Sequence, residues 1–158
     1  MVVFERYHLA PCGINCGTCR AYLRTRNKCS GCMSVNGSNI SHCINCSIRN
    51  CGLLKKTDSN FCSQCDQFPC SKIKNIDKRY RTKYKTGLIQ NLCLITERGI
   101  ETYLFNETKR WTCSSCGAVL SIHKDNCLKC GKKYSDPLLQ EINYWISEID
   151  YMQISDQK

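Results

Sequence analysis

Residues 111–134 read "WTCSSCGAVLSIHKDNCLKCGKKY" and contain two Cys-x-x-Cys-Gly motifs, with ten residues between Cys116 and Cys127. A Cys-x-x-Cys turn directs both sulfurs toward one point about 2.3 Å from each, which is half of a tetrahedral zinc site. Two such turns joined by a hairpin form a zinc ribbon, and "AVLSI" is long enough for one strand of it. We therefore expect one structural zinc site made by Cys113, Cys116, Cys127 and Cys130.

Two other features of this segment agree with a zinc ribbon. Gly117 and Gly131 follow the two motifs, where a tight turn often needs a positive φ. His123 lies between the motifs, but four sulfurs already complete the metal shell. We therefore expect His123 to be a packed or solvated histidine.

Cysteine is several times more frequent in this chain than in ordinary proteins, with 16 among 158 residues. Six pairs have the Cys-x-x-Cys spacing: Cys16/Cys19, Cys29/Cys32, Cys43/Cys46, Cys62/Cys65, Cys113/Cys116 and Cys127/Cys130. One pair is compatible with a redox motif, whereas six in a short chain favour metal ligation over disulfides. No stretch is apolar enough for a signal peptide or a transmembrane helix. We therefore expect a cytoplasmic protein with reduced thiols and no membrane contact.

The N-terminal part of the chain is denser in cysteine. The residues expected to bind metal there are Cys12, Cys16, Cys19, Cys29, Cys32, Cys43, Cys46, Cys51, Cys62, Cys65 and Cys70. The four Cys-x-x-Cys pairs suffice for two sites, which leaves Cys12, Cys51 and Cys70 for a third site that lacks one ligand. His42 and His8 are the possible additional ligands. We expect about four zinc ions in the whole chain, and the spacing does not choose which cysteines share a metal.

An iron–sulfur cluster is the alternative to zinc in residues 12–70. Cys12, Cys16 and Cys19 have the Cys-x3-Cys-x2-Cys spacing of radical S-adenosylmethionine enzymes, but those enzymes need a large barrel of alternating strands and helices. This chain has neither the length nor the alternation. An ordinary four-cysteine cluster stays open, because thiolates bind iron and zinc alike.

The order of the N-terminal motifs also carries a resemblance. "PCGINCGTCRAY", "CSGC", "HCINCSIRNCG" and "FCSQCDQFPCSKI" follow one another as in a family of small cysteine-rich prokaryotic proteins, a domain of unknown function that opens with a Pro-Cys-Gly motif. Some members also carry a tail similar to "RWTCSSCGAVLSIHKDNC", so the resemblance extends over residues 9–134. It implies zinc binding at the eleven N-terminal cysteines and brings no settled activity.

A helical pattern precedes the ribbon. Leu88, Leu92 and Ile95 recur at i, i+4 and i+7, and Gly99 is a typical residue just beyond a helix end. Cys93 lies beside this apolar stripe with no cysteine partner nearby. We expect it to be a core thiol rather than a ligand or nucleophile.

After the ribbon, the sequence predicts a closing amphipathic helix. Asp136 suits the N-cap and is followed by proline, and the apolar residues from Leu138 to Ile149 share one helical face. The fold class we predict is a small metal-stabilised α+β protein, in which metal supplements a small core. Its parts are an irregular multi-zinc cysteine-rich domain (8–86), a helical connector (87–110), the zinc ribbon (111–134) and the C-terminal helix (136–152).

The formal net charge is +10, and the excess lies in residues 1–90, which carry 15 basic and 4 acidic residues. Ligating cysteines are deprotonated, so four metals would lower the net charge to roughly +3. One basic segment without cysteine keeps its charge. Its possible nucleic-acid contacts are Lys72, Lys74, Lys78, Arg79, Tyr80, Arg81, Lys83, Tyr84 and Lys85. Cations contact phosphates and tyrosines stack on unpaired bases, although a solvated helix face is the simpler explanation of most charge runs.

These observations favour a zinc-binding, non-catalytic module or adaptor that contacts single-stranded nucleic acid, RNA or a ribonucleoprotein through residues 72–85. A protein-interaction scaffold that uses the ribbon or the 138–149 face is the second interpretation. An iron–sulfur electron carrier or enzyme is the third. Catalysis is disfavoured because the sequence has no Ser/His/Asp arrangement, phosphate loop or His-Glu-x-x-His motif, and few general bases.

Overall fold

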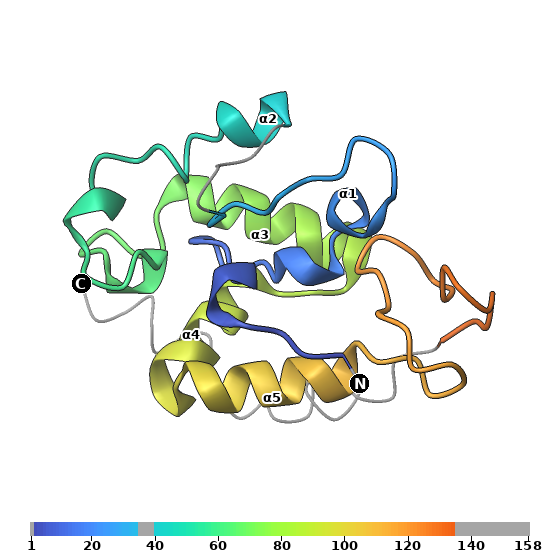
Figure 1. Cartoon of the computed structure of the whole chain (residues 1–158). Helices are drawn as coiled ribbons and strands as arrows, with labels where there is room; N and C mark the ends of the chain where they lie inside the picture. Colours follow the sequence, from blue (N-terminus) through green and yellow to red (C-terminus); the bar gives the residue numbers. More distant parts are fainter. Residues whose placement is uncertain (1, 35–39, 135–158) are drawn as a thin grey trace.

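The computed structural model describes residues 2–34 and 40–134. Three longer helices contribute buried residues to the core of these described residues (Figure 1): α3 (Ser71–Tyr84), α4 (Leu88–Arg98) and α5 (Ile100–Arg110). The shorter elements are η1 (Arg6–His8), η2 (Cys16–Thr18), α1 (Arg20–Leu23), α2 (Ser41–Ile44), η3 (Leu54–Lys56) and η4 (Cys62–Gln64). The predicted C-terminal helix, 136–152, lies outside the described residues.

Helix α4 is central, because it packs against both α3 and α5. Leu88, Leu92 and Ile95, the apolar positions that predicted this helix, are all buried in the core. Gly99 caps the helix with a φ of 81°. The sequence prediction of this helix and of its end is therefore confirmed. Cys93, on the same helix, is half-buried and packs against the core, as expected of a core thiol.

A buried carboxylate joins α3 to α4. Asp77 is the single acidic residue of α3, and it is only 1% exposed. Its Oδ1 accepts hydrogen bonds from the backbone amides of Leu88 and Ile89, at 2.7 and 3.0 Å. Its Oδ2 accepts a hydrogen bond from Nε of Arg81 at 2.6 Å. The first amides of a helix have no partner within it, so Asp77 caps α4 from the neighbouring helix.

The N-terminal segment runs between α3 and α5 (Figure 1, blue). Asn91 of α4 donates to the carbonyl oxygen of Gly13 at 2.9 Å, and Asn15 donates to the carboxylate of Glu107 on α5 at 3.1 Å. Gly13 has a φ of +85°, and a Cβ there would lie 2.7 Å from the carbonyl oxygen of Leu88. A side chain would therefore push this loop away from α4, so the close approach requires glycine.

Strand pairing in the described residues is limited to three isolated antiparallel bridges: Leu9 with Asn15, Thr112 with Val119, and Asn126 with Lys133. The α+β class is therefore not confirmed, and the described part is mostly helical with irregular loops. Residues 118–122 were expected to form a hairpin strand but contribute only one such bridge. The backbone hydrogen bonds of residues 111–134 are made mainly within two short turns and not between paired strands. None of the helices described here has both the length and the apolar character needed to cross a membrane.

Replacing Asp77 with alanine should separate α3 from α4. The change leaves two buried amides without their acceptor, so we expect the free energy of unfolding to fall by about 2 kcal/mol or more. Urea denaturation followed by far-ultraviolet circular dichroism measures this loss. Arg81→Ala is the matched control, because the Arg81 side chain is 53% exposed and its ion pair should contribute less than about 1 kcal/mol. Equal losses in the two variants would contradict the assigned capping role.

Candidate metal centre

The C-terminal lobe (residues 111–134) contains two Cys-x-x-Cys turns with the same backbone geometry. In each turn the amide of the first cysteine donates to the carbonyl five residues later, at 2.8 or 2.9 Å. The carbonyl of that cysteine accepts from the amide of the glycine four residues later, at 2.9 Å in both turns. These glycines, Gly117 and Gly131, have φ values of 68° and 74°. The predicted need for a positive φ after each motif is therefore confirmed.

The two turns bring four sulfurs together. Those of Cys113, Cys116, Cys127 and Cys130, the four-cysteine cluster, all lie within 4.8 Å of one another. The sulfur of Cys113 is 3.7 Å from that of Cys130, and the sulfur of Cys116 is 3.6 Å from that of Cys127. Sulfurs placed tetrahedrally about 2.3 Å from one ion stand about 3.8 Å apart. The cluster is therefore compatible with a single tetrahedral metal ion.

The surroundings of the cluster favour thiolates unequally. The backbone amides of Ser115 and Cys116 lower the pKa of the Cys113 thiol to about 6. The pKa of the Cys116 thiol is instead raised to about 11: the Ala118 amide lowers it, but burial and the Cys127 thiol outweigh that effect. Neighbouring thiolates repel one another, and a bound cation removes this repulsion. The cluster therefore has the electrostatics of a cation site.

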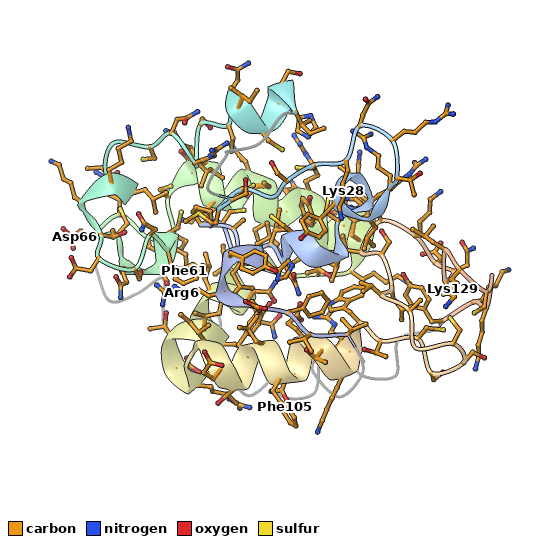
Figure 2. All side chains as sticks on the ribbon, in the orientation of Figure 1. Arg6, Lys28, Phe61, Asp66, Phe105 and Lys129 are labelled. Carbon is orange, nitrogen blue, oxygen red and sulfur yellow. The ribbon has the colours of Figure 1, made fainter. Side chains whose placement is uncertain are left out.

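Access to the cluster is one-sided. Cys113 and Cys127 are buried, whereas Cys130 is exposed and directly follows the exposed Lys129, which Figure 2 labels. An ion can therefore reach the sulfurs from solvent without opening the core.

His123 lies outside the cluster. Its Nδ1 accepts a hydrogen bond from the amide of Arg20 at 3.3 Å, and its ring contacts that of Tyr84 with 4.6 Å between centroids. Burial, and to a lesser extent Arg20, lower its pKa. The prediction of a packed histidine is confirmed, and the packing attaches the lobe to the N-terminal part of the chain.

The N-terminal cysteines fall into two neighbourhoods. The first is a cavity lined by Cys51, Cys62, Cys65 and Cys70. The second surrounds Cys32, whose thiol contacts that of Cys16; this contact and burial raise its pKa. In residues 2–34 and 40–134, the four-cysteine cluster is the one group of three or more potential ligands whose ligand atoms all lie within 4.8 Å of one another.

The second neighbourhood also includes Cys19, Cys29 and Cys43. Burial raises the pKa of Cys19, and the thiols of Cys29 and Cys32 add to the rise. Burial also raises the pKa of Cys12, with contributions from the thiols of Cys32, Cys62 and Cys46, so Cys12 lies within electrostatic reach of both neighbourhoods.

Sequence reasoning did not find this grouping. It left open which cysteines share a metal and counted Cys12, Cys51 and Cys70 as the remainder for a third site, and the structure places Cys51 and Cys70 beside the Cys62/Cys65 pair. The short spacing in "FCSQCDQFPC" was the available signal, because Cys70 follows Cys65 by only five residues.

The two histidines considered as possible ligands have different surroundings. His8 is buried, and its Nδ1 accepts from the amide of Glu5 at 2.9 Å while its Nε2 lies 3.2 Å from the hydroxyl of Tyr22. Both ring nitrogens of His8 are therefore engaged by protein groups. His42 is exposed on α2.

The predicted nucleic-acid residues lie on or just after α3. The exposed cations are Lys72, Lys74, Lys78, Arg79, Arg81, Lys83 and Lys85. Tyr80 and Tyr84 are half-buried on another face of α3, with 5.1 Å between their ring centroids. Both rings contact His123 of the C-terminal lobe. The structure therefore separates the tyrosines from the cations.

Comparison with known proteins finds a matching family model for the N-terminal segment. Residues 8–75 match a family model described as "Protein of unknown function (DUF3795)". Over these residues the chain is similar to that uncharacterised family. The resemblance seen in the four motifs is confirmed for the DUF3795 segment, which ends within α3 and leaves out the four-cysteine cluster. No curated protein and no solved structure matches the chain.

Replacing Cys113 with serine should remove one metal ion per chain. The C-terminal lobe supplies all four sulfurs of its own cluster, so the cysteines of the DUF3795 segment should keep their metal. Elemental analysis of the purified chain counts the ions. The matched control is Cys93→Ala, which removes a half-buried thiol of α4 and should leave the metal content unchanged. Release of most of the metal by Cys113→Ser would mean that the two regions share ligands.

Proposed function

We propose that the protein is a zinc-binding, non-catalytic module that contacts nucleic acid through the exposed cations of α3. The observation that carries the metal part is the four-cysteine cluster, with sulfur separations of 3.6 and 3.7 Å. Zinc is the metal we assign, since four thiolates arranged tetrahedrally are typical of structural zinc sites. The C-terminal lobe is then a zinc ribbon.

The small extent of regular structure in the lobe supports a structural role for this zinc. Residues 111–134 have two isolated bridges and no helix. A segment with so few backbone ladders gains little from secondary structure, and metal binding supplies the missing free energy in small domains of this kind.

The charge of α3 supports the nucleic-acid part. Six of its 14 residues are exposed cations, and its single acid, Asp77, is buried against the start of α4. The outward side of the helix therefore presents positive charge without an interspersed carboxylate. Such a surface binds phosphates and releases their counterions, which makes the affinity fall steeply with salt.

The tyrosines receive no stacking role in this proposal. Tyr80 and Tyr84 pack on His123 and hold the lobe against α3. Phosphate contact does not by itself distinguish single strands from duplexes, so the preference for single-stranded nucleic acid expected from the sequence loses its main support. Contact with RNA or DNA backbones remains the proposal.

A triple replacement, Lys78, Arg79 and Lys83 to alanine, tests the contact. We expect weaker binding to a mixed-sequence RNA or DNA, with the slope of log affinity against log salt reduced by about one unit for each lost phosphate contact. Fluorescence anisotropy at several salt concentrations measures both quantities. Arg81 is left unchanged because it pairs with Asp77.

The matched control removes the same charge from other exposed positions, with Lys55, Lys56 and Lys129 replaced by alanine. If both triple variants lose affinity equally, net charge rather than α3 accounts for binding. If the metallated wild-type chain binds neither RNA nor DNA at low salt, the nucleic-acid part of the proposal is wrong.

A further inference from the structure

A cavity of about 150 Å³ lies beside the start of α3, within the DUF3795 segment. Its lining includes Cys51, Cys62, Cys65 and Cys70 together with buried apolar residues such as Ile48 and Leu54. The volume is roughly ten times the minimum space that one water molecule needs. A single ion held by converging sulfurs leaves no comparable space.

The backbone fixes each of these cysteines. The amide of Cys62 donates to the carbonyl of Pro11 at 3.0 Å, and the amide of Cys65 donates to the carbonyl of Cys62 at 3.1 Å. Cys70 is the N-cap of α3, and the amide of Cys51 donates to a carbonyl three residues earlier. The four side chains therefore start from positions held by the surrounding fold.

The four sulfurs are neighbours, yet they are not packed as in the C-terminal cluster. All four cysteines line the same cavity. No three of these four cysteines, however, have sulfurs that all lie within 4.8 Å of one another, as the sulfurs of the C-terminal cluster do. The same chain therefore holds two groups of four cysteines with different spacing.

That spacing discriminates between metal centres. Around one zinc ion, four sulfurs must approach to about 3.8 Å of one another. In a four-iron cluster each thiolate binds a different iron, so the protein sulfurs stand farther apart, and inorganic sulfide fills the space between the irons. A mostly apolar cavity lined by four cysteines, no three of whose sulfurs all lie within 4.8 Å of one another, agrees with the second arrangement rather than the first.

We propose that this cavity holds an iron–sulfur cluster of the four-iron type, with Cys51, Cys62, Cys65 and Cys70 as its ligands. The site is separate from the zinc site of the C-terminal lobe and needs no contribution from the proposed nucleic-acid contact.

The polar groups at the cavity agree with an anionic centre. Backbone amides of Leu54 and Leu53 point to the sulfur of Cys51, and hydrogen bonds of this kind stabilise cluster thiolates. Lys72 also lines the cavity, where its cation offsets negative charge. Lys72 and Leu53 are exposed, so the cavity opens to solvent on their side and iron and sulfide can enter.

The test uses the full chain, purified without oxygen and reconstituted with ferrous iron and sulfide under reducing conditions. We expect about four iron and four sulfide per chain, a broad absorption band near 400 nm that dithionite bleaches, and zinc retained in the C-terminal lobe. The double variant Cys62→Ser/Cys65→Ser should lose at least nine-tenths of the band. The milder variant Cys51→Ser should reduce it or change the electron paramagnetic resonance spectrum of the reduced cluster.

Two controls make the assignment specific. Cys113→Ser should lose zinc and keep the band, and Cys93→Ala should keep both. Far-ultraviolet circular dichroism of the helices α3 and α4 reports whether the Cys62→Ser/Cys65→Ser chain is folded. If it is not, the Cys51→Ser variant supplies the test of the ligand assignment.

Three results would overturn the proposal. The first is a colourless chain that binds a second zinc through these four cysteines. The second is a chain that takes up no iron. The third is an iron–sulfur band that survives in Cys62→Ser/Cys65→Ser and in Cys51→Ser but disappears in Cys16→Ser/Cys19→Ser, which would place the cluster in the neighbourhood of Cys32.

Discussion

The rest of the described structure depends on the hydrogen bonds that the loop from Ala10 to Cys19 accepts. Three separate regions donate hydrogen bonds to its backbone carbonyl oxygens. The first backbone amide of η4 donates to Pro11, and a side-chain amide of α4 donates to Gly13. A backbone amide of the C-terminal lobe donates to Thr18. Buried carbonyls need partners, so none of these regions can move away without leaving a polar group unpaired. One short cysteine-rich loop therefore sets the positions of the cavity, the central helix and the lobe.

Some of this arrangement could be predicted from the sequence because it depends on neighbours along the chain. The helix at Leu88 follows from its apolar spacing and from the glycine after it, and both are local signals. The cysteine cluster of the lobe follows from two turns that each fit within six residues. In both cases the information needed for the structure lies within a few residues of the feature.

Other features could not be predicted because they depend on contacts across the chain. Asp77 appeared in the sequence as one acid in a basic run, but its carboxylate is buried by a helix that begins eleven residues later. Tyr80 and Tyr84 appeared to share a surface with the neighbouring cations, yet their ring partner, His123, lies about forty residues away. The grouping of Cys51 with Cys70 likewise depends on how the intervening loop closes, which spacing alone does not determine.

The contact between His123 and the two tyrosines has a thermodynamic consequence. His123 lies between the two halves of the four-cysteine cluster in sequence, so its position depends on how the cluster closes, and the metal that we propose there would fix that closure. Metal binding in the lobe and the orientation of α3 are then linked: the free energy by which metal would favour this orientation equals the free energy by which the orientation would favour metal binding. Metal binding at the four sulfurs would in this way influence the position of the basic side of α3, which the metal does not contact.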